Sequence, residues 1–80
     1  MDKSKSRVLV IEDEEEYLQT YKEWLQPEGY QVSWSMEAED ALQKIRSLRP
    51  DLILLDIMMP GIDGFEVCRD LRASGVRTPI

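Results

Sequence analysis

The sequence has no histidine, and Cys68 is the only cysteine among its 80 residues. Without histidine, the chain lacks the most common general base and metal ligand, and it cannot carry phosphohistidine chemistry of its own. A lone thiol cannot close an internal disulfide, which favours a reducing compartment, and Cys68 stands at a helical core position that suits packing better than nucleophilic attack. Any chemistry must therefore depend on carboxylates, and we expect a cytoplasmic protein.

Basic charge and long apolar runs are also scarce. Ten Lys and Arg residues stand against 16 Asp and Glu residues, and the net charge of −6 argues against direct nucleic-acid binding. The charged start is followed by only four apolar residues, which excludes a signal peptide or a membrane span. We expect one thin-cored domain at residues 7–80 and a flexible tail at residues 1–6.

Three strand-like runs, residues 8–11, 31–35 and 52–55, alternate with helical patterns. The first and third runs are continuously apolar, as in parallel strands covered on both faces, whereas the second is less apolar, as in an edge strand. The alternation predicts an α/β fold with a doubly wound parallel sheet. A strand order of 2-1-3 would place the first strand at its centre, and residues 77–80 resemble the entry to a fourth strand.

Capping residues predict where the helices begin. Asp13 with Glu16 matches a capping box for the first helix, Ser35 is the predicted cap of the second, and Asp63 with Glu66 matches a capping box for the third. The side chains expected to face the core are Leu18, Tyr21 and Leu25 in the first helix, Ala38, Ala41, Leu42 and Ile45 in the second, and Phe65, Cys68 and Leu71 in the third.

Both apolar strands end in acids: Glu12 and Asp13 follow the first, and Asp56 ends the third. A buried carboxylate without a partner costs several kcal/mol or takes up a proton, so Asp56 is the strongest sign of a site. Parallel strands joined by right-handed crossovers bring their C-terminal ends to one rim, where the order 2-1-3 would bring these three acids together. The helix dipole accounts for residues 14–16 without any function.

Three carboxylates at one rim predict a bound cation. Two of them about 5 Å apart repel by roughly 3 kcal/mol at an effective dielectric constant of 20. Mg²⁺ fits the oxygen ligands, whereas zinc would call for histidine or paired cysteines. Beside Mg²⁺, an ionised Asp56 would be able to attack a phosphoryl group and form an aspartyl phosphate.

Residues 8–14 (VLVIEDE) and 50–66 (PDLILLDIMMPGIDGFE) closely resemble the receiver domain of two-component response regulators, which has a flavodoxin-like fold. The resemblance implies that Asp56 accepts a phosphoryl group from a sensor histidine kinase or a phosphotransfer protein. It implies a signalling domain that transfers this group only to itself, not an enzyme acting on other substrates.

The resemblance also implies a set of metal ligands. Asp13 and Asp56 would bind Mg²⁺ directly, Glu12 would act through water, and the backbone carbonyl of Met58 would supply a further oxygen. Receivers of this family continue to the order 2-1-3-4-5, and only the first three strands and helices are complete here. Their later hydroxyl residue and lysine have no counterpart in this sequence.

Two partner expectations follow from this partial match. An effector domain would lie beyond Ile80. The outer edge of the third strand would lack its neighbour, and an exposed apolar edge predicts self-association, strand swapping or marginal stability.

Three alternative functions can be weighed against the sequence. A receiver-like module that binds partners without phosphorylation is the main alternative, and Trp34 on the second strand is the aromatic residue to test for partner contact. A haloacid-dehalogenase-like phosphohydrolase would need an acid where Met58 stands. A dinucleotide-binding domain would need glycines where residues 12–15 are all acidic.

Overall fold

The computed structural model describes residues 6–56 and 63–80. The elements in this part of the chain are β1 (Arg7–Ile11), α1 (Glu15–Leu25), the 3-10 helix η2 (Gln26–Glu28), β2 (Gln31–Ser35), α2 (Ala38–Leu48), β3 (Leu52–Leu55) and α3 (Gly64–Ala73). The strands pair in parallel in the order β2-β1-β3. This confirms the predicted α/β fold and strand order.

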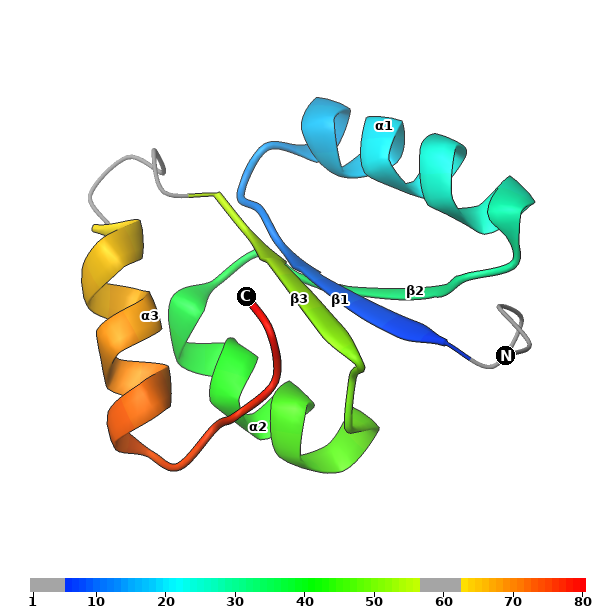
Figure 1. The fold of residues 1–80 in the computed structure, drawn as a ribbon. Coiled ribbons are helices and arrows are strands. Elements are labelled where there is room, and N and C mark those ends of the chain that lie inside the picture. The colour runs from blue at the N-terminus through cyan, green and yellow to red at the C-terminus, as the bar shows by residue number, and fades with distance from the viewer. Residues whose placement is uncertain (1–5, 57–62) are drawn as a thin grey trace.

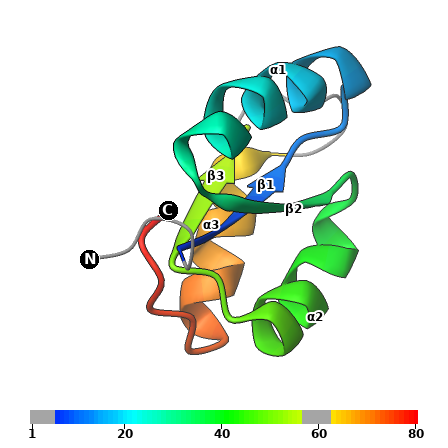
Figure 2. The same cartoon turned by 90° about the vertical axis from the view of Figure 1, so that its right-hand side faces the viewer.

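The sheet separates two apolar layers. Figures 1 and 2 show α1 on one face of the sheet and α2 with α3 on the other. Because successive residues of a strand point to opposite faces, β1 supplies both layers. The buried residues on the α1 face are Val8, Val10 and Leu18, and those on the opposite face are Leu9, Ile11, Ala41, Ile45, Ile53 and Leu71.

The register of the sheet places the C-terminal ends of all three strands side by side. Ile11, the last residue of β1, is paired with Ser35 of β2 and with Leu55 of β3. The residues that follow Ile11 and Leu55, which are Glu12 and Asp56, therefore emerge side by side at the same rim of the sheet.

Two of the predicted helix caps are wrong. Helix α1 has Glu14 as its N-cap residue and α2 has Glu37, and neither side chain makes a capping hydrogen bond. Ser35 is still part of the sheet, because its carbonyl accepts a hydrogen bond from the Glu12 N–H (3.0 Å). Asp13 lies beyond the end of β1, and α1 begins at residue 15, two residues after it.

The predicted start of α3 is confirmed, but part of its predicted inward face is wrong. Asp63 is the N-cap, and its carboxylate accepts from the Phe65 N–H (2.9 Å). Gly64 and Leu71 are buried, whereas the Phe65 side chain is 65% exposed. One residue turns a helix by about 100°, so a helix that buries positions 64 and 71 points Phe65 outward. Cys68 is half-buried.

Residues 77–80 lie along the outer edge of β3 without forming a strand. The Ile53 N–H donates to the carbonyl of Pro79 (2.9 Å). The Arg72 guanidinium donates to the carbonyls of Val76 (3.0 Å) and Thr78 (2.8 Å), which ties this segment to α3. None of the helices in the described ranges is long and apolar enough to cross a bilayer.

Candidate functional site at the carboxyl ends of the strands

Backbone hydrogen bonds hold two of the predicted site residues in place. The Glu12 N–H donates to the carbonyl of Ser35, and the Asp56 N–H donates to the carbonyl of Ile11 (3.1 Å). Each bond extends the ladder one residue past a strand end. The positions of Glu12 and Asp56 therefore depend on the sheet itself, and a change of side chain at either position leaves these bonds in place.

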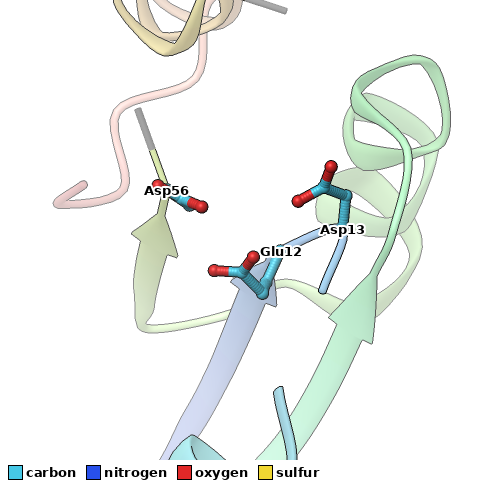
Figure 3. A group of neighbouring side chains, drawn as sticks. All are labelled: Glu12, Asp13 and Asp56. Carbon is cyan, nitrogen blue, oxygen red and sulfur yellow. The ribbon is translucent and has the colours of Figure 1, made fainter. Parts of the chain in front are cut away.

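Three of the predicted site residues meet at this rim. One carboxylate oxygen from each of Glu12, Asp13 and Asp56 lies within 4.8 Å of the other two. Figure 3 shows the three side chains around one space beyond the ends of β1 and β3. This group of three acids is called the acidic rim below. Met58, whose carbonyl was the fourth expected ligand, lies outside the described residues.

Glu12 is the most deeply buried acid of the rim, with 2% of its surface exposed. Burial raises the pKa of its carboxyl group above the ordinary value, and the nearby Asp56 and Asp13 carboxyls raise this pKa further. The Glu14 N–H, which donates to Glu12 Oε1 (3.1 Å), acts in the opposite direction on the same pKa. Negative charge at Glu12 is therefore disfavoured unless a cation is close.

One oxygen of Asp13 has the character of an unused ligand. Asp13 Oδ1 is buried and has no hydrogen-bond partner within residues 6–56 and 63–80. A buried polar atom without a partner is unusual in a folded protein and calls for an explanation such as an ion. Mg²⁺ prefers hard oxygen ligands and binds through one or two carboxylates with water completing its shell, so the acidic rim fits this ion.

Ser35, which the sequence predicts to cap the second helix, instead helps to hold Glu12 at the rim. It is fully buried, and its hydroxyl donates to the Glu37 carbonyl (2.7 Å) while its own carbonyl holds Glu12. The strand register would have indicated this role, because Ser35 ends β2 beside the residue that precedes Glu12.

Comparison with known proteins agrees with the fold. The response regulator receiver domain family matches residues 8–80. Over 74 residues the chain is 42% identical to the response regulator MprA of Mycolicibacterium vanbaalenii, covering 92% of this chain and 32% of MprA. The chain thus spans about a third of the length of this curated relative.

Solved structures resemble the chain as well. The receiver domain of a Francisella response regulator superposes with a TM-score of 0.83 at 30% identity, covering 92% of this chain and 61% of that one. The response regulator TrrA of Thermotoga maritima, solved with Mg²⁺ and BeF, gives a TM-score of 0.77 at 43% identity, covering 86% of this chain and 60% of TrrA. TrrA has also been solved in complex with the histidine kinase ThkA, with a TM-score of 0.76 at 44% identity and coverage of 85% and 59%. Since the family match runs from the first buried strand to the last residue, this chain belongs to the family of response regulator receiver domains.

Proposed function

We propose that the acidic rim binds Mg²⁺ and that Asp56 accepts a phosphoryl group from a histidine kinase or a phosphotransfer protein. The observation that carries this proposal is the convergence of three carboxylates within 4.8 Å, one of which has a buried oxygen without a partner. The relative TrrA, which has been solved with Mg²⁺ and BeF and with a histidine kinase, supports the same function.

The proposed roles follow the positions of the three acids. Asp13 and Asp56 bind the ion directly and Glu12 acts through water, as the resemblance to receiver domains implies, while Glu12 Oε1 accepts the Glu14 N–H. The Met58 carbonyl remains a predicted fourth oxygen. When bound, Mg²⁺ supplies positive charge that offsets the repulsion among the carboxylates and the charge on the phosphoryl oxygens.

Asp56 is the proposed nucleophile of this rim. One of its carboxylate oxygens forms a bond to phosphorus while the bond from phosphorus to the nitrogen of the donor histidine breaks, and the proton needed by that nitrogen comes from solvent. The product is an acyl phosphate on Asp56 and a free histidine on the donor. The backbone bond from the Asp56 N–H to Ile11 keeps the nucleophile at the rim throughout.

The test is to titrate the isotopically labelled chain with Mg²⁺ and beryllofluoride, a phosphoryl analogue, and to follow the backbone amides by NMR. We expect Mg²⁺ alone to shift amides near Asp13, and beryllofluoride added to the Mg²⁺-bound chain to cause further shifts at Leu55 and Asp56 in the wild type and none in Asp56→Asn. Glu14→Gln is the matched control, because Glu14 is an exposed acid next to the rim and is not one of its three members.

Unchanged amides around Asp56 in the wild type would refute the phosphoacceptor role. A receiver-like module that binds its partners without phosphorylation would then be the better account of this chain. In either case we propose an effector domain beyond Ile80, because MprA is about three times as long as this chain. We also propose a cytoplasmic location, because a single cysteine favours a reducing compartment.

We further propose that the outer edge of β3 supports self-association. Residues 77–80 cover part of this edge, because the Pro79 carbonyl accepts from the Ile53 N–H, while Leu52 at the start of the strand remains 37% exposed. Apolar edges that stay uncovered pair with other chains. A monomer in sedimentation experiments, combined with cooperative thermal unfolding, would contradict this proposal.

A further inference from the structure

The second outer strand, β2, has one edge that faces away from the sheet. The Gln31 N–H and the Ser35 carbonyl both bond toward the β1 side, to Ser6 and Glu12 respectively. Backbone groups of successive residues in a strand point to opposite edges. The N–H and C=O groups of Val32 and Trp34 therefore point away from β1, along the outer edge of β2.

A lysine from α2 occupies this edge. Lys44 Nζ donates to the outward carbonyl of Trp34, and the same ammonium forms an ion pair with Asp40 (3.0 Å). The Ser35 hydroxyl in turn lies 3.3 Å from Asp40 Oδ2, which links the ion pair back to the end of β2. The lysine is thus held by groups from both the strand and the helix.

A second cation lies over the same strand. Lys22 Nζ of α1 is 4.2 Å from the centroid of the Trp34 ring, a distance typical of a cation–π interaction. The outer strand of a chain with a net charge of −6 is therefore flanked by two lysines. Lysine at a sheet edge opposes pairing with another strand, and here both lysines reach the edge strand from neighbouring helices.

The surface beside Lys44 would favour association if the lysine were absent. A hollow of about 290 Å³ is lined by Ser33, Trp34, Lys44 and Leu48. Trp34 is 41% exposed and Leu48 is 37% exposed, so large apolar side chains border the open edge. Burial of such side chains is the main driving force of protein association.

We propose that the outer edge of β2 is a strand-addition surface for a second copy of this chain, and that Lys44 keeps it closed. Two β2 edges are self-complementary about a two-fold axis, because Val32 of one copy can exchange both of its backbone bonds with Trp34 of the other. This pairing uses the Trp34 carbonyl, which is the group that Lys44 occupies. The surface is separate from the acidic rim and does not depend on the function proposed for it.

The first test compares sedimentation velocity over a concentration series for the wild type and Lys44→Met, which keeps the long apolar stem and removes the charge. We expect Lys44→Met to self-associate with a dissociation constant at least about tenfold lower than that of the wild type. Arg46→Met is the matched control, because it removes an equal charge from an exposed position of α2. Lys44→Arg, which retains a cation, should behave as the wild type.

Equal association of Lys44→Met, Arg46→Met and the wild type would overturn the proposal. A second variant identifies the surface. The Val32 N–H points outward, so Val32→Pro removes no bond to β1, and edge strands tolerate proline. Adding Val32→Pro to Lys44→Met should restore wild-type sedimentation, and circular dichroism would verify that each variant is folded.

Hydrogen exchange gives an independent measurement. The amides of Val32 and Trp34 should exchange more slowly in associated Lys44→Met than in the wild type, because pairing protects them. An associated Lys44→Met that retains rapid exchange at both amides, or one that Val32→Pro fails to dissociate, would mean that a different surface is responsible and that the proposal is wrong.

Discussion

The apolar middle of β1 and β3 and the acidic rim at their ends are built by the same hydrogen-bond ladder, yet they act on stability in opposite directions. Ile11 is completely buried and Glu12, the next residue, is 2% exposed. Burial of an Ile side chain stabilises the fold by about 1.5–3 kcal/mol, whereas burial of a carboxylate beside two others disfavours its ionised form. Folding energy from the middle of the strands thus maintains a cluster of charges that would otherwise separate.

The largest expected effect is in the apolar middle. We expect Ile53→Ala to lower the free energy of unfolding by about 3 kcal/mol, because Ile53 is completely buried and its truncation leaves a cavity. Leu52→Ala is the matched control on the same strand, and since Leu52 is 37% exposed its loss should be below about 1 kcal/mol. Urea unfolding measures both, and equal losses would show that β3 does not support the core as described.

Mg²⁺ should change the rim from a destabilising to a stabilising region. At about 100 times its dissociation constant, Mg²⁺ should raise the free energy of unfolding of the wild type by about 2.7 kcal/mol. Asp13→Asn should lose most of this gain, because it weakens the buried oxygen that has no other partner. Urea unfolding of both proteins at increasing Mg²⁺ concentration, without calcium, tests this prediction. An equal rise in the free energy of unfolding in both proteins would argue against Asp13 as a ligand.

Glu12→Gln should stabilise the metal-free protein. The amide keeps an oxygen for the Glu14 N–H and removes one like charge, a gain of about 1–3 kcal/mol between screening as in water and an effective dielectric constant of 20. The pKa of Glu12 is raised in the folded state, so its ionisation removes stability as the pH rises from its ordinary value of 4.5 through the folded pKa. The difference in the free energy of unfolding between Glu12→Gln and the wild type should therefore increase as the pH rises through this range, and it should vanish at lower pH. A constant difference across the pH series would contradict this account.

Substitution of Asp63 should have the smallest effect on the free energy of unfolding, and it tests whether an acid can also stabilise this fold. Its carboxylate caps α3 through the Phe65 N–H, and the helix dipole favours negative charge at this end. We expect Asp63→Ala to cost about 1 kcal/mol in thermal or urea unfolding, and Asp63→Ser, which retains a capping oxygen, to cost less. A neutral Asp63→Ala would mean that the cap contributes nothing measurable.

Much of the rim was predictable because its geometry follows from backbone rules. Apolar runs indicated β1 and β3, the parallel order 2-1-3 placed them next to each other, and the acids that follow each run had to share one rim. Two caps were not predictable in this way. Ser35 has a good capping residue type, but its carbonyl belongs to the Glu12 N–H, a partner 23 positions away in the sequence.

The sequence by itself determined the alternation of strands and helices and the presence of acids at the carboxyl ends of two apolar strands, because periodicity and residue type show both. The order 2-1-3, and with it the meeting of Glu12, Asp13 and Asp56, was an expectation that the strand pairing in the structure decided, because the handedness of crossovers does not fix which strands are neighbours. Only the tertiary structure decided that Phe65 points outward, that one oxygen of Asp13 is buried without a partner, and that Lys44 lies on the edge of β2. These features depend on how helices rotate and approach the sheet, which is set by packing among residues distant in the sequence.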